Sequence, residues 1–145
     1  MKPKIVKNEE GTMLHSLGDN LFVKYTGEDT DGQFALIQQQ NIPGTGLPAH
    51  LHENEDELFK VVQGQVKFSL GNDEYILNAG DSVFCPRGIA HAWEVTGTEE
   101  ARVDLTIVPA GLEKMFAEIS QIENQKENMD KLMPILAKYK ISMIH

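Results

Sequence analysis

Three histidines and one glutamate are the residues whose types and spacing could do chemistry. His50 and His52 are one residue apart, and Glu57 follows them after an acidic run. His91 ends a second stretch, which begins at Gly80. Imidazole nitrogens and carboxylate oxygens together suit divalent transition metals. The two stretches therefore predict a single metal site.

The distance in sequence between the histidine pair and Glu57 requires a bend. On a strand, side chains alternate between the two faces, so His50 and His52 point to the same side. Such a pair alone is weak evidence, because it more often marks two surface residues. Glu57 lies an odd number of positions beyond His52, so only a turn or bulge brings it inward, where a cation would offset its burial. The other acidic residues of this run are expected at the surface: Glu53, Glu55 and Asp56.

The rest of the chain reads as short strands that could hold these residues. Runs rich in β-branched and aromatic residues alternate with turn sequences at regular spacing, and no helix pattern lies between them. The expected strands include residues 21–26, 33–42, 65–70, 74–77, 82–85, 91–95 and 102–108. This pattern predicts an all-β, antiparallel sandwich or barrel. Its expected core consists of Val66, Phe68, Leu70, Val83, Trp93, Val103, Leu105 and Ile107.

Three consecutive glutamines, Gln38, Gln39 and Gln40, allow two interpretations. Their side chains alternate in direction, so at least one could point inward as a hydrogen-bonding group of a pocket. Alternatively, all three decorate the outside of the barrel.

The hydrophobic period changes from two to about 3.6 after Gly111, which predicts a helical extension. Asp130 is the expected cap of a second helix, and Pro134 is expected in its first turn. The apolar residues form one face of each helix: Leu112, Met115, Phe116, Ile119 and Ile122, then Leu132, Met133, Leu136 and Tyr139. Either the barrel or a second subunit must cover these faces. The chain thus divides into an N-terminal arm (1–20), a barrel (21–109) and a helical extension (110–145).

Length and composition set the class of protein. At 145 residues, with 41% hydrophobic and 24% charged residues, the chain suits one globular domain. Its 13 basic and 22 acidic residues give a net charge of -9, which disfavours nucleic acid as a partner. Cys85 is the only cysteine, so no intrachain disulfide can form. The sequence shows no signal peptide and no membrane span, so a cytoplasmic protein without membrane contact is expected.

The two histidine-containing stretches resemble the two sequence motifs of the cupin superfamily. The patterns are G(X)5HXH(X)4E(X)6G over residues 44–64 and G(X)5PXG(X)2H over residues 80–91. The departure is Val95, where the second motif usually ends in asparagine, and this change affects a local hydrogen bond but no metal ligand. More widely, the chain is similar to single-domain cupins related to quercetin dioxygenase.

This resemblance implies a small jelly-roll barrel that holds a divalent transition metal, which could be Fe, Mn, Ni, Co, Cu or Zn. Glu57 would also be catalytic, because such a glutamate loosens from the metal to accept the substrate's proton. A small-molecule substrate and a homodimer are expected. The implied metal ligands are His50, His52, Glu57 and His91. The mouth of the site is expected to be apolar and lined by Phe59, Phe68, Cys85 and Trp93.

The reaction stays open between three classes. The first is an oxygenase acting on a flavonol or a smaller enolisable compound. The second is a non-redox isomerase or lyase, and the third is a protein that binds a metal and a small ligand without turnover. A barrel that retains the histidines without metal is the structural alternative. Outside the motifs, His15 and His145 are not expected to be ligands, and Arg87 and Arg102 are expected at the surface.

Overall fold

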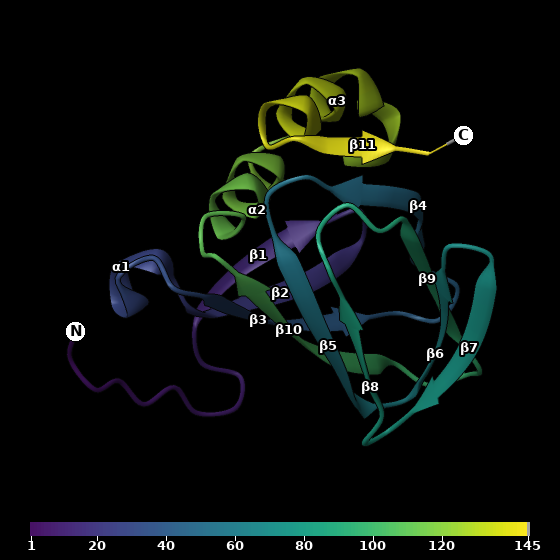
Figure 1. Ribbon diagram of the computed structural model, residues 1–145, viewed down its shortest axis with the longest axis horizontal. Coiled ribbons are helices and arrows are strands. Elements are labelled where there is room, and N and C mark those ends of the chain that lie inside the picture. Colours follow the sequence, from purple (N-terminus) through teal and green to yellow (C-terminus); the bar gives the residue numbers. More distant parts are fainter. Residues whose placement is uncertain (145) are drawn as a thin grey trace.

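Two antiparallel sheets that face each other form the body of the molecule (Figure 1). The computed structural model describes residues 1–144. One sheet has the order β1 (Thr12–Ser16), β2 (Asp19–Tyr25), β3 (Ala35–Asn41), β10 (Ala101–Val108), β5 (Asp56–Gln63) and β8 (Ser82–Cys85). The other has the order β11 (Ile141–Met143), β4 (Gly46–His52), β9 (His91–Thr96), β6 (Gln65–Leu70) and β7 (Asp73–Asn78). The predicted all-β, antiparallel jelly-roll architecture is confirmed.

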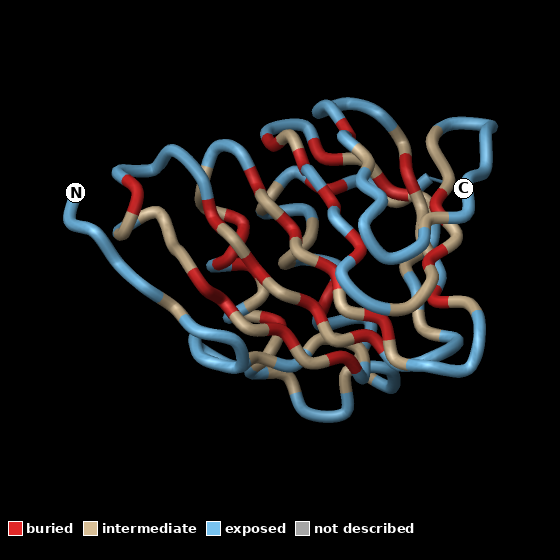
Figure 2. Tube along the Cα trace, turned by 90° about the horizontal axis from the view of Figure 1, so that it is seen from below, coloured by how far each residue is buried: buried red, intermediate tan, exposed pale blue. Residues whose placement is uncertain are grey.

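Buried and more exposed residues alternate along the strands, as Figure 2 shows. The alternation is strict in β3 and in most of β10, so one row of each strand faces the interior between the sheets. Five of the expected core residues are buried: Val66, Phe68, Val103, Leu105 and Ile107. The other three pack against this core but are only partly buried: Leu70, Val83 and Trp93.

The bend that the sequence required lies between β4 and β5. β4 ends at His52 in the five-stranded sheet, and β5 begins at Asp56 in the six-stranded sheet. The residues between them form bends and an irregular segment. The chain therefore crosses from one sheet to the other, which is why Glu57 can face the histidines despite its odd spacing.

The C-terminal segment closes one end of the barrel (Figure 1). It contains α2 (Glu113–Ser120), the short 3-10 helix η1 (Gln125–Glu127) and α3 (Met129–Lys138), and it ends in β11. Met115, Ile119 and Leu132 are buried in the common core, so the apolar helix faces are covered largely within the chain. The strand β11 was not predicted, because three residues carry too little pattern to be recognised.

The start of α3 differs from the sequence-based expectation. The residue that flanks the helix is Asn128, so Asp130 lies inside the first turn and is not the cap. Pro134 lies in the second turn and not in the first. Proline has no N–H, so the helix lacks one hydrogen bond to the carbonyl of Asp130. Packing of Leu132 against the barrel stabilises the helix in spite of that loss.

Two further elements lie near the N-terminus. The short helix α1 (Gly27–Thr30) connects β2 and β3. β1 and the first residues of β2 lie within the segment 1–20, so the six-stranded sheet begins inside the expected arm. Within residues 1–144, no helix has both the length and the apolar character needed to cross a membrane.

Candidate metal centre

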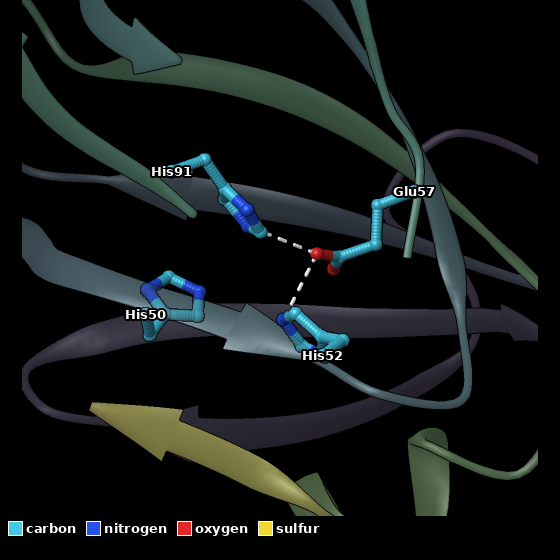
Figure 3. A group of neighbouring side chains, drawn as sticks. All are labelled: His50, His52, Glu57 and His91. Atoms are coloured by element: carbon cyan, nitrogen blue, oxygen red, sulfur yellow. Dashed lines mark ion pairs between the residues drawn. The ribbon is translucent and has the colours of Figure 1, made fainter. Parts of the chain in front are cut away.

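Four side chains from both sheets converge on one point inside the barrel (Figure 3). His50 and His52 lie on β4 and His91 lies on the neighbouring β9, all in the five-stranded sheet. Glu57 reaches them from β5 in the opposite sheet. One potential ligand atom of each of the four residues lies within 4.8 Å of the others, and all four residues are buried. The structure thus brings together all the residues that were predicted as ligands.

Local backbone contacts orient two of the imidazoles. Nδ1 of His50 lies 2.8 Å from the carbonyl oxygen of Pro48, and Nδ1 of His91 lies 3.1 Å from that of Ile89. An Nδ1–H that donates to a carbonyl leaves Nε2 with a free lone pair, which is the form that binds a metal. His50 and His91 are also register partners on adjacent strands, with ring centroids 4.4 Å apart.

The carboxylate of Glu57 is held close to two histidines without hydrogen-bonding to them. Its Oε1 lies 3.0 Å from Nε2 of His52 and 3.1 Å from Nε2 of His91. All three atoms are buried and have no hydrogen-bond partner. Buried polar atoms that converge without a hydrogen-bond partner are energetically unfavourable. A divalent cation among them would supply the missing partner, so the residues present fit a metal.

Burial and neighbouring charges set the protonation of the cluster. Burial, reinforced by the charge of His91, lowers the pKa of His50 to about 4, so this imidazole is neutral near pH 7. Burial alone would lower the pKa of His52, but Glu55 and Glu57 outweigh it and raise the pKa. Burial alone would raise the pKa of Glu57, but His52 and His91 outweigh it and lower the pKa. Glu57 is therefore an ionised, buried carboxylate, the state in which it can bind a cation.

Glu55 was expected at the surface, and this prediction is wrong. Its side chain is only 8% exposed, and Oε2 lies 3.6 Å from Nδ1 of His52. The bend that sends the chain from one sheet to the other folds Glu55 back beside the histidine, while Glu53 stays exposed and Asp56 half-buried. A carboxylate beside the outer nitrogen of a ligand imidazole typically fixes its orientation. Alternation alone could not reveal this residue, because the segment has no regular period.

A Glu55→Gln substitution should weaken metal binding about 10- to 100-fold, the usual effect of losing a carboxylate behind a metal-binding histidine. The amide keeps the shape of the side chain but removes the charge that supports His52. Competition against a chelator of known affinity measures the change. Glu53→Gln is the matched control, because Glu53 is an exposed acid of the same bend and should leave affinity unchanged. Equal affinity in the two variants would contradict the role of Glu55.

Aromatic side chains pack behind His91. The ring of Phe68 stacks on this imidazole with centroids 5.9 Å apart and 5° between the planes. Phe59 contacts both rings, with its centroid 5.1 Å from Phe68 and 6.0 Å from His91. Two buried phenylalanines therefore restrict the rotation of His91.

Cys85 is buried and pairs in register with Glu57 on the neighbouring strand. Burial, together with the charge of Glu57, raises the pKa of the thiol to about 12. Since the thiolate is the reactive form, the folded protein should resist alkylation by iodoacetamide at pH 8 over hours. Mass spectrometry would detect the adduct, and the urea-unfolded protein, which should react fully, is the control. Rapid labelling of the folded protein would contradict this prediction.

The cluster opens onto a cavity of about 150 Å³. Phe59 and Trp93 line it as expected, whereas Phe68 and Cys85 do not. α2, α3 and β11 supply an apolar roof, formed by Met115, Phe116, Ile119, Met129, Leu132, Met133, Leu136, Ile141 and Met143. β11 pairs directly with the histidine strand, with Ile141 opposite His52 and Met143 opposite His50. The helical extension is thus part of the site, a role that its amphipathic pattern alone did not reveal.

Three of the remaining candidates, His15, Arg87 and Arg102, lie outside the cluster. His15 is exposed, with Nδ1 2.8 Å from Oδ1 of Asn20, and His145 lies outside the described residues. Arg87 is exposed and forms a two-point ion pair with Asp56, in which both N–O distances are 3.0 Å. Arg102 is half-buried and pairs with two glutamates at the surface, Glu9 and Glu100.

Comparison with known sequences agrees with this geometry. The Cupin domain family model matches residues 40–108, which include all four residues of the cluster. Quercetin 2,3-dioxygenase of Bacillus subtilis is 28% identical to this chain over 115 residues. The match covers 79% of the chain but only 34% of the relative, so the chain spans about a third of that protein's length.

Comparison with solved structures shows the same fold. A protein from Thermotoga maritima, described as a predicted oxalate decarboxylase, matches with a TM-score of 0.68 and 21% identity, covering 73% of this chain and 99% of that one. Streptomyces Pac13, a nucleoside dehydratase, matches with a TM-score of 0.61 and 18% identity, covering 78% of this chain and 88% of that one. At these identities the likeness concerns the fold alone.

Proposed function

Since this chain belongs to the cupin superfamily, we propose that it is a metal-dependent enzyme of the quercetinase-like oxygenase type, acting on a small enolisable or aromatic compound. The observation that carries the proposal is the cluster itself. Four buried side chains offer ligand atoms within 4.8 Å of one another, beside a cavity of about 150 Å³. Three imidazoles and a carboxylate without a thiolate suit iron, manganese, nickel, cobalt, copper or zinc.

The residues of the cluster would have two roles, metal binding and proton transfer. His50, His52, His91 and Glu57 would hold the divalent metal. When bound, the metal would act as a Lewis acid that lowers the pKa of a substrate hydroxyl. Glu57 lines the cavity, and on loosening from the metal its carboxylate would accept the proton that such a hydroxyl releases. Phe59, Trp93 and the apolar roof exclude water from this proton transfer.

Dioxygen uptake tests the proposed reaction. Metal-free protein would be reloaded with iron, manganese, nickel or zinc and mixed with a panel of enediols, diketones and hydroxylated aromatic compounds. We expect uptake with at least one redox-active metal and none with zinc. The absence of dioxygen uptake with every compound and every metal would contradict the oxygenase proposal.

A non-redox isomerase or lyase is the second candidate, favoured by the complete carboxylate and imidazole donor set, which zinc accepts equally well. The fold itself accommodates such chemistry, since the structurally similar Pac13 is a nucleoside dehydratase. Product formation without oxygen, retained in the zinc-loaded protein, would identify this class. The same panel therefore separates the two candidates.

A further inference from the structure

Three polar residues form a second chemical feature of the cavity, which we call the polar wall: Asp19, Gln39 and Asn41. They lie on β2 and β3, in the sheet opposite the three histidines. Their exposed fractions are 7%, 6% and 1%, and all three line the same cavity as His50, His52 and Glu57. Apart from the cluster, almost every other lining side chain is apolar. The cavity therefore has two polar regions within an apolar surface.

The register of the six-stranded sheet separates the two regions. On β10, Ile107 pairs with Glu57, whereas Val103 pairs with Gln39 and Ala101 pairs with Asn41. Along the direction of β10, the polar wall and Glu57 therefore lie at different levels of the inner face of the sheet. A ligand that contacts both regions must carry polar groups at its two ends.

Hydrogen bonds fix the orientation of the polar wall. Asn41 donates through Nδ2 to Oδ2 of Asp19 at 2.8 Å. Oδ1 of Asp19 accepts from the hydroxyl of Thr45 at 3.1 Å and from the N–H of Ile42 at 3.3 Å. The amide of Asn41 is therefore oriented, and its Oδ1 is buried without a hydrogen-bond partner. Because a buried, unpaired acceptor is unfavourable, this oxygen favours a ligand that donates.

The charge around the cavity disfavours an anionic ligand at this end. No lysine or arginine is among the described residues that line the cavity. Both oxygens of Asp19 already accept hydrogen bonds, so its carboxylate offers an anion no donor. A carboxylate or phosphate placed here would meet the carboxyl oxygens of Asp19, and no lysine or arginine of the cavity lining would offset its charge.

The volume of the cavity suits a small ligand. A cavity of about 150 Å³ can hold a single benzene ring. Flexible methionines in the roof can adapt to different ring substituents, but they do not add a second compartment.

We propose that the polar wall selects a neutral substrate of single-ring size with a hydroxyl or another hydrogen-bond donor at the end remote from its metal-binding oxygen. This inference rests on the proposed function, because it takes the cavity as the substrate site. It narrows the substrate class, since it disfavours compounds with an anionic remote end.

Binding of three matched phenols to the zinc-loaded and the metal-free protein tests the inference by calorimetry. 2-(4-Hydroxyphenyl)ethanol carries a donor at the remote end, 4-ethylphenol carries none, and 4-hydroxyphenylacetate carries an anion. We expect the alcohol to bind about five- to tenfold more tightly than 4-ethylphenol, the value of one neutral hydrogen bond. The anion should bind at least tenfold more weakly than the alcohol. Equal or tighter binding of the anion would overturn the inference.

Variants of the polar wall test which residue causes the preference for the alcohol over 4-ethylphenol. In Asn41→Leu the alcohol and 4-ethylphenol should bind equally, because the acceptor is gone. Gln39→Leu, on the same wall, is expected to reduce the preference less and covers the case in which Asn41→Leu fails to fold, which circular dichroism detects. An undiminished preference in every folded variant would contradict the role of the wall. The two failures are distinct: a protein that does not bind zinc would contradict the proposed metal centre, whereas a zinc-loaded protein without any preference would contradict the inference alone.

Discussion

A His52→Ala variant should bind divalent metal at least about 100-fold more weakly than the wild-type chain. Changes behind the ligands already weaken metal binding 10- to 100-fold, so loss of a ligand should exceed that range. The substitution removes one imidazole from a cluster in which Nε2 of His52 lies 3.0 Å from Oε1 of Glu57. Elemental analysis of protein purified without a histidine tag, followed by titration with zinc, measures the effect.

Two further variants control for the buried carboxylates. His52 is close to both Glu55 and Glu57, so its removal also leaves two buried acids with less compensation. His50→Ala avoids this complication, because His50 forms no ion pair within residues 1–144. His15→Ala changes an exposed histidine outside the cluster and should have no effect. The same metal content in the wild type and in both cluster variants would disprove the metal centre.

The cluster was predictable from the sequence because its residues obey simple rules. Alternation on a strand places His50 and His52 on one side, and the odd spacing of Glu57 required the bend that separates β4 from β5. The spacing around His91 supplied the remaining member through resemblance to known motifs. These are short-range patterns, which a single sequence displays directly.

The surroundings of the cluster were less predictable, because they depend on contacts between distant segments. Glu55 is buried only because the crossing between sheets folds it against His52. The roof depends on the pairing of β11 with β4. This pairing places Met143 opposite His50, although the two residues are far apart in the sequence. Gln39 illustrates the same limit: alternation allowed either at least one inward glutamine or three outward ones, and only the structure shows that Gln39 is buried.

A Gly46→Ala substitution should reduce stability by about 3 kcal/mol, the upper end of the usual effect of overpacking. A Cβ at this position would lie 2.2 Å from the carbonyl oxygen of Trp93 and 2.9 Å from Cα of Glu94, both in the backbone of β9. Backbone atoms of a paired strand cannot rotate away as a flexible side chain can. Urea unfolding followed by circular dichroism measures the loss.

The same substitution should also weaken metal binding, because β4 carries His50 while β9 carries His91. Any separation of the two strands moves these register partners apart and disturbs the convergence of their lone pairs. Gly44→Ala separates this effect from ordinary backbone strain. Gly44 has φ +83 and open space around its missing Cβ, so alanine should reduce stability by about 1 kcal/mol without changing metal affinity. A Gly46→Ala protein with wild-type metal affinity would show that the spacing of β4 and β9 does not control the site.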